Sequence, residues 1–141
     1  MKKKLKVFLF QPKKDNVSSD IILYKFHLSR LFPDREVEVI AKDPRHDELD
    51  GISDVDLFIS KIGNGGDFTG FGLDVFKKIS ITNQSKLRDT PFIWVTTILK
   101  ELKENKRNEI VYNIYKQISP YFISIPIRMS NFDALVKELI I

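Results

Sequence analysis

The sequence predicts an α/β domain built on one five-stranded, doubly wound parallel sheet with helices on both faces. Strand-like and helix-like segments alternate along the whole chain, which is typical of a parallel sheet joined by crossover helices. The length of 141 residues is that of about one domain. No repeat, low-complexity stretch or linker interrupts the pattern. We therefore expect residues 1–141 to form a single domain.

The first half of the chain contains three strand-like segments. Leu5–Phe10 is short and apolar, and Pro12 follows it, which predicts a buried strand. Glu36–Ile40 alternates charged and apolar residues, which suits a less buried strand at an edge of the sheet. Asp56–Ser60 is a second apolar run and is the third predicted strand.

Helical segments are predicted between and after these strands. We expect Ser18 or Ser19 to cap the first helix. Its inward face follows i, i+3, i+7, i+10 spacing before Pro33, on Ile21, Tyr24, Leu28 and Leu31. A short helical turn is expected around His46–Asp50, and Gly72–Ser80 is predicted to be a helix.

The second half of the chain begins with a predicted strand and a long predicted helical region. Pro91–Thr97 is apolar and rich in β-formers, with Trp94 expected in the core. A long polar helical region is expected from about Ile98 to Ser119. Its charged residues are expected to form a solvated face with supporting ion pairs. Its second half carries an apolar stripe on Ile110, Ile114 and Ile118, with Val111 and Tyr115 beside it.

The chain is predicted to end with a strand and a helix. Tyr121–Ile125 is the last strand, before Pro126. Ser130 and Asp133 approximate a capping box for the final helix. The inward stripe of that helix is predicted on Phe132, Leu135, Val136 and Leu139.

Composition limits the function classes. The chain is 43% hydrophobic and 30% charged, which argues against disorder. The absence of cysteine excludes disulfides and thiolate metal sites. Only His27 and His46 could supply imidazole, and neither has a partner at metal-ligand spacing, so we expect no metal and no cofactor.

The positive charge is concentrated at the amino terminus. Six lysines and one aspartate give residues 1–16 a charge of +5, which leaves −1 for the rest of the +4 chain. We interpret this as an exposed basic edge; contact with nucleic acid or an anionic membrane is the less favoured alternative. The apolar run Val7–Phe10 is too short for a signal peptide, and no segment approaches the roughly 20 apolar residues of a membrane span. A cytoplasmic protein is expected.

Candidate chemistry is sought where the strands end. In an open parallel sheet, the loops after strands one, three, four and five meet at a crevice that binds ligands. Magnesium-dependent phosphoryl chemistry would need carboxylates there. The chain instead supplies an amide, a lysine, hydroxyls and apolar groups, on Gln11–Pro12, Lys61, Thr96–Thr97 and Ile125–Pro126. Lys61 could bind an anion.

A glycine-rich loop, Gly63–Gly72, follows Lys61 and precedes a predicted helix. Such a loop could hold a phosphate with its backbone N–H groups. Its spacing fits neither common nucleotide fingerprint, because position 68 is Phe and Phe71–Gly72 stands where Lys–Ser/Thr would follow. A turn is the favoured interpretation. The alternative function is a small-ligand, nucleotide or anion-binding domain that uses this loop and Lys61.

The order of these landmarks resembles response-regulator receiver domains over essentially the whole chain. Asp56–Ser60 resembles the strand that leads to the phosphoacceptor, and Gly72–Val75 resembles the start of the following helix. Pro91–Thr96 resembles the strand that ends in the switch Ser/Thr, here Thr96. Phe122–Pro126 resembles the fifth strand, with Phe122 at the aromatic switch position. The resemblance implies a flavodoxin-like sheet of order 2-1-3-4-5.

The departures from the family lie in the phosphorylation site. The acidic pair falls on Gln11 and Pro12, the phosphoacceptor aspartate on Lys61, and the invariant lysine on Ile125. Without carboxylates, neither a divalent cation nor an acyl phosphate is expected. We also expect the Lys61 ammonium to extend outward into solvent, since the family's acidic neighbours are missing.

Together these features imply a degenerate pseudo-receiver. We expect a non-enzymatic two-component-type signalling module that docks to another signalling protein without aspartate phosphorylation. The resemblance places the interaction surface on the fourth helix, fifth strand and fifth helix, including Lys103, Arg107, Tyr115 and Phe122. Homodimerisation through that face is a further expectation.

Overall fold

The computed structural model describes residues 3–12, 17–49, 54–62, 70–81, 89–97, 99–124 and 129–140, without the side chains of residues 17, 18, 129 and 130. The strands are β1 (Lys3–Phe10), β2 (Arg35–Lys42), β3 (Leu57–Lys61), β4 (Phe92–Thr96) and β5 (Phe122–Ser124). The helices are α1 (Val17–Leu31), α2 (Phe71–Ser80), α4 (Leu99–Glu104), the 3-10 helix η2 (Lys106–Asn108), α5 (Glu109–Ile118) and α6 (Met129–Ile140).

The five strands form one parallel sheet in the order β2-β1-β3-β4-β5. The predicted fold class and strand order are therefore confirmed, as is the edge position of β2. β1 pairs with β2 residue for residue from Lys3↔Arg35 to Phe10↔Lys42. Just before β3, Asp56 Oδ2 accepts a hydrogen bond from the Lys6 N–H at 2.8 Å, which connects β1 to the start of β3.

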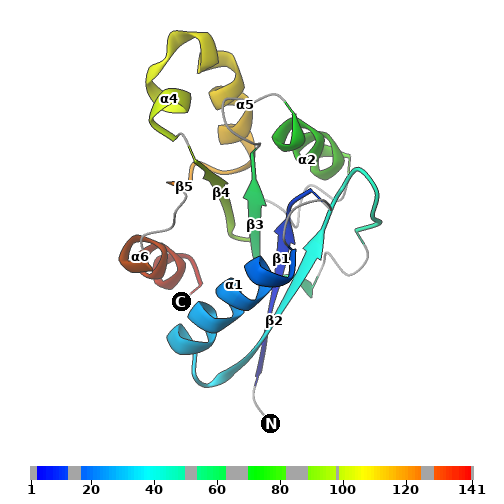
Figure 1. The fold of residues 1–141 in the computed structure, drawn as a ribbon, viewed down its shortest axis with the longest axis vertical. Helices are drawn as coiled ribbons and strands as arrows, with labels where there is room; N and C mark the ends of the chain where they lie inside the picture. Colours follow the sequence, from blue (N-terminus) through cyan, green and yellow to red (C-terminus); the bar gives the residue numbers. More distant parts are fainter. Residues whose placement is uncertain are drawn as a thin grey trace.

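Strand alternation sorts the side chains onto two faces, each covered by helices (Figure 1). One face is covered by α1 and α6, and the strand residues on it are aliphatic. Leu28, Phe132 and Val136 of these two helices are buried against it, as their predicted stripes indicated. The other face is covered by α2, α4 and α5 and is largely aromatic. Six aromatic rings on this face pack against one another, and the centroids of neighbouring rings are 4.7–6.4 Å apart. The rings belong to Phe8, Phe10, Phe58, Phe92, Trp94 and Tyr115.

The crossover between β2 and β3 begins with a hydrogen-bonded turn instead of the predicted helical turn. The N–H groups of His46 and Asp47 both donate to the Asp43 carbonyl, at 2.9 and 2.8 Å. Asp43 and Pro44 begin a turn because the Asp side chain bonds its own local backbone. Residue 50, the end of the predicted helical turn, lies outside the described residues.

The predicted long helix over 98–119 is divided at Asn105. This residue has an extended backbone, and its side-chain oxygen accepts from the Arg107 N–H at 3.0 Å, which caps η2. An Asn side chain that bonds nearby backbone competes with helix propagation. After the break, α5 buries Tyr115, and Val111 and Ile118 pack partly buried against the same cluster. Ile110 is 76% exposed, so the predicted apolar stripe is wrong at this residue. The charged residues of this region are exposed as predicted, at Lys100, Glu101, Lys103, Glu104, Lys106, Arg107, Glu109 and Lys116.

Two predicted helix caps are also wrong. α1 begins at Val17, before Ser18 and Ser19, and α6 begins at Met129, before Ser130. Both helices start earlier than the local sequence indicated, because packing on the sheet, more than a capping side chain, stabilises a helix in a folded domain.

Candidate functional site

The loop after β1 carries a buried amide in place of a carboxylate. The Gln11 backbone N–H donates to the Lys42 carbonyl at 3.1 Å, which continues the β1–β2 pairing. The Gln11 side chain is 1% exposed, and neither amide atom has a hydrogen-bond partner among the described residues. Pro12 beside it is also buried. The two residues offer no anionic oxygen to a cation.

Lys61 ends β3 and lies on the α1 face of the sheet, as do Leu57 and Ile59 before it. Its Nζ lies 3.5 Å from Oδ2 of Asp20, in the first part of α1. The two side chains are only 21% and 30% exposed. The expectation that this ammonium extends freely into solvent is therefore wrong: α1 brings a carboxylate to the end of β3.

Asp20 also affects its neighbour one turn along α1. Burial raises the pKa of the Tyr24 hydroxyl well above its usual range, and the negative charge of Asp20 raises it further. Tyr24 is 5% exposed and packs against Phe132, with ring centroids 5.8 Å apart. Its phenol therefore stays neutral at physiological pH, and the carboxylate of Asp20 is balanced by Lys61.

The switch-like pair lies on the aromatic face. Thr96 ends β4 and is 2% exposed, and strand alternation places it on the same face as Trp94. Phe122 is the register partner of Trp94 and packs edge-on against Tyr112 of α5, with centroids 5.1 Å apart. Thr96 pairs in register with Ser124, so Thr96 and Phe122 are two register positions apart on adjacent strands.

The glycine loop is described only at its end. Residues 63–69 and Ile125 lie outside the described residues, so the predicted positions there are not placed. The Gly72 N–H donates to the Ile62 carbonyl, and Gly70 precedes the first residue of α2. The Gly72 N–H is therefore already used within the protein. Together with the Lys61–Asp20 pair, this weakens the predicted anion site.

An ion pair between a buried carboxylate and an exposed arginine follows β2 and was not predicted from the sequence. Asp43 follows β2, is 1% exposed, and binds Arg45 through Nε and the terminal guanidinium nitrogen at 3.0 and 2.9 Å. The guanidinium lies 5.1 Å from the ring centroid of Phe71, the first residue of α2. The pair connects the β2 turn to α2. The Asp43–Pro44 turn signal was the available clue, but nothing in the sequence pointed to Phe71.

The predicted docking face needs one correction. Tyr115 is fully buried beneath α2 and cannot contact a partner. Lys103 and Arg107 are exposed, and Phe122 is partly buried. Lys103, Arg107 and part of Phe122 are therefore the predicted surface residues that a partner protein could contact.

Within the part of the chain that the structure describes, no cluster of three or more His, Asp or Glu side chains could hold a metal ion. Over the same residues, no helix is long and apolar enough to cross a membrane.

We predict that Gln11→Leu stabilises the fold by about 1–3 kcal/mol, because a buried polar group without a partner carries a desolvation cost of that order. Leucine has a similar size and needs no partner. Urea denaturation of wild type and variant measures the difference. Gln11→Glu is the control and should destabilise the fold, since it places a charge in the same buried space. Loss of stability in Gln11→Leu would show that the amide is satisfied in solution.

No family model matches the sequence, and no curated protein matches it in sequence. The fold is similar to a signal receiver domain of a DNA-binding response regulator from Colwellia psychrerythraea, with a TM-score of 0.63 and 12% identity over 96% of this chain and 98% of that chain. It is similar to a chemotaxis response regulator of Vibrio cholerae, with a TM-score of 0.55 and 18% identity over 96% of this chain and 98% of that chain. It is also similar to the non-phosphorylated HemR receiver domain from Leptospira biflexa, with a TM-score of 0.58 and 17% identity over 97% of this chain and 94% of that chain. Each covers nearly the whole chain and has a receiver fold. The chain therefore has the fold of response-regulator receiver domains.

Proposed function

We propose that this chain is an atypical receiver-like signalling module that docks to another signalling protein without aspartate phosphorylation. The observation that carries the proposal is Lys61. It occupies the family's phosphoacceptor position at the end of β3 and is held by Asp20. A module of this kind acts in the cytoplasm as a binding partner and not as an enzyme.

The chemistry of the site supports this proposal. An aspartyl phosphate needs a carboxylate nucleophile, whereas Lys61 presents a positive charge already paired with a carboxylate. Phosphoryl transfer also needs a cation that neutralises the developing charge, and magnesium needs oxygen ligands. Gln11 and Pro12 are both buried, and neither carries a charge.

The proposal also predicts the result of exposure to a phosphodonor. Incubation with phosphoramidate and Mg²⁺ should leave the intact mass unchanged, because a lysine ends β3 and no cluster of metal-ligating side chains occurs among the described residues. Intact-mass spectrometry measures the result, beside a receiver domain with a complete acidic site as a positive control. The Asp20→Asn variant should behave like wild type. A labile adduct of one phosphoryl group on any aspartate of the wild-type chain would refute the proposal.

Self-association is the second part of the proposal. By resemblance, the dimer would use the face formed by the fourth helical region (α4, η2 and α5), β5 and the final helix α6. Sedimentation equilibrium over a wide concentration range tests it. A monomer at high concentration would remove the homodimer and leave docking to a different protein.

A further inference from the structure

β2 is a long edge strand, and among the described residues no strand lies beyond its outer side (Figure 1). It has eight residues, whereas β5 at the other edge of the sheet is described over three. Its pairing with β1 continues residue for residue, and it contains no proline. Prolines and bulges are two devices that usually protect an edge strand from pairing with another chain. β2 has neither device, so its edge is open to a further strand.

The backbone of β2 presents hydrogen-bonding groups along this edge. The Gln11 N–H, just after β1, donates to the Lys42 carbonyl, so Lys42 directs its backbone groups toward β1. Successive residues of a strand direct their N–H and C=O groups to opposite sides. The residues of β2 that direct these groups outward are therefore Val37, Val39 and Ala41. They form a row of donors and acceptors with which a strand of another chain can pair.

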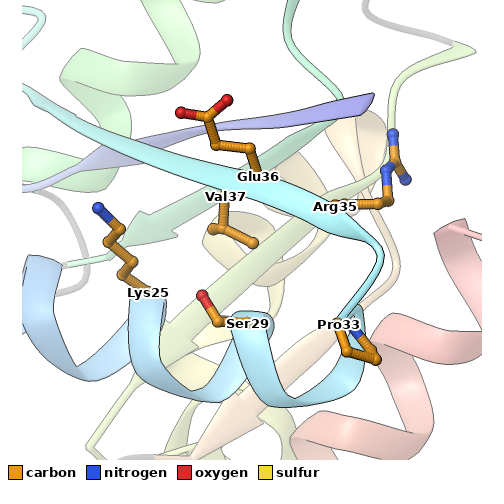
Figure 2. Close-up of a pocket in the computed structure, with 6 residues that line it drawn as sticks. All are labelled: Lys25, Ser29, Pro33, Arg35, Glu36 and Val37. Atoms are coloured by element: carbon orange, nitrogen blue, oxygen red, sulfur yellow. The ribbon is translucent and has the colours of Figure 1, made fainter. Parts of the chain in front are cut away.

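The charged side chains of β2 lie on one face of the sheet. Val37 and Val39 are buried on the α1 face. Strand alternation places Glu36, Glu38 and Lys42 on the opposite face, and all three are at least partly exposed. Figure 2 shows the Glu36 carboxylate pointing away from α1. This face of the strand is therefore negative in its first half and positive at its end, which makes it complementary to an antiparallel copy of itself.

One antiparallel register satisfies both the backbone and the charges. Outward-directed residues must lie opposite outward-directed residues, because hydrogen-bonded pairs in an antiparallel ladder face each other. When Val39 lies opposite Val39 of a second copy, Val37 lies opposite Ala41, and these pairs exchange about six backbone hydrogen bonds. In the same register Glu36 lies opposite Lys42, once at each end by two-fold symmetry. Opposite charges that face each other across two strands stabilise the pairing.

The neighbouring registers are less favourable. A register centred on Glu38 places the two Glu38 carboxylates directly opposite each other, which is destabilising. A register centred on Ile40 avoids this repulsion but pairs only residues 38–42 of β2. The Val39 register pairs residues 36–42 and places no like charges directly opposite each other. The sequence of β2 therefore favours the Val39 register.

A pocket of about 360 Å³ lies at the start of this edge, between α1 and β2. It is lined by Lys25, Ser29, Pro33, Arg35, Glu36 and Val37. Figure 2 shows Lys25 and Ser29 extending from α1 toward β2. In the Val39 register, Ala41 of the second copy comes opposite Val37 on the strand side of the pocket. Alanine is the smallest side chain of β2, so this register brings the least bulk to the space beneath the helix.

We propose that β2 pairs with β2 of a second copy of this chain, antiparallel and centred on Val39, so that two five-stranded sheets join into one continuous sheet. The interface is isologous and closed, because the same residues serve both copies. This inference goes beyond the proposed docking function and lies at the edge of the sheet opposite β5. An extended segment of a different protein would meet the same backbone groups, but the match of Glu36 to Lys42 favours a second copy.

Exchange of the two charges tests the occupant and the register together. Glu36→Lys and Lys42→Glu each place like charges opposite each other at both ends, so each variant alone should dimerise about tenfold more weakly than wild type, or weaker still. An equimolar mixture of the two variants restores both unlike pairs and should dimerise about as tightly as wild type. The double variant Glu36→Lys/Lys42→Glu should do the same. Sedimentation velocity over a wide concentration range measures each dissociation constant.

Lys77→Glu is the matched control, because Lys77 is an exposed lysine on α2 and not on β2. It makes the same change of charge as Lys42→Glu and should leave the dissociation constant unchanged. Rescue by mixing also shows that both single variants are folded. A mixture that dimerises no more tightly than the single variants would overturn the proposal. A wild-type chain that stays monomeric at about 1 mM would leave the edge to an extended segment of another protein and would also overturn it.

The two candidate self-association surfaces give different results. Lys103→Glu/Arg107→Glu changes the fourth helical region and should leave the β2 dimer intact. A dimer that this variant dissociates, and that both β2 variants leave unchanged, would use the other face and overturn the proposal. The phosphodonor experiment does not involve β2. A phosphorylated aspartate would therefore refute phosphorylation independence alone, whereas failure of the charge exchange would refute the β2 pairing alone.

Discussion

Trp94→Ala is expected to lower the free energy of unfolding by about 3–5 kcal/mol, the usual cost of removing a buried tryptophan. Trp94 is fully buried at the centre of the aromatic face. Its ring centroid lies 4.7 Å from that of Phe92 and 4.8 Å from that of Tyr115. Its Nε1 donates to the Tyr115 carbonyl at 3.0 Å. The substitution therefore leaves a cavity and removes the tie between β4 and α5.

Trp94→Phe separates these two contributions. It keeps an aromatic ring but removes the Nε1 donor, so the Tyr115 carbonyl loses this hydrogen bond and keeps the one from the Ser119 N–H, at 3.2 Å. We expect a smaller loss than in Trp94→Ala, of about 1–3 kcal/mol. Urea denaturation followed by circular dichroism compares the three proteins. A Trp94→Ala variant as stable as wild type would show that the aromatic face is not packed as described.

Gly72→Ala is expected to destabilise the fold by about 1–3 kcal/mol through overpacking. A Cβ at this position would lie 2.5 Å from the Tyr115 hydroxyl oxygen and 2.8 Å from the Ile62 carbonyl oxygen. The carbonyl belongs to the backbone just after β3 and accepts from the Gly72 N–H, so it cannot move away without losing this bond. Glycine is therefore required at the second residue of α2 because of close approach. Thermal or urea denaturation measures the loss.

A double-mutant cycle with Tyr115→Phe tests this cause. Removing the hydroxyl takes away the closest atom to the added methyl group, so Gly72→Ala should cost less in the Tyr115→Phe background. The rescue should be partial, since the Ile62 carbonyl remains. An equal cost in both backgrounds would show that the hydroxyl is not the obstacle.

The reliable sequence predictions came from strand patterns and helix periodicity. Leu5–Phe10 and Pro91–Thr97 are apolar runs that can only be buried on both faces, and both form central strands. The i, i+3, i+7 pattern of α1 placed Tyr24 and Leu28 in the core because inward positions repeat with the helical turn. The prediction of one long helix over 98–119 failed because the Asn105 side chain accepts from the Arg107 N–H and interrupts it, and Ile110 after the break is exposed.

The sequence alone therefore determined the parallel sheet and its crossover helices, and it puts the uncharged Gln11 and Pro12 after β1 and a lysine, Lys61, at the end of β3. These follow from local patterns and from residue identity. Only the tertiary structure decided that Lys61 pairs with Asp20 and that Tyr115 is buried beneath Gly72. Each depends on how one helix is rotated against the sheet. That rotation is determined by packing between residues far apart in sequence, which no local pattern contains.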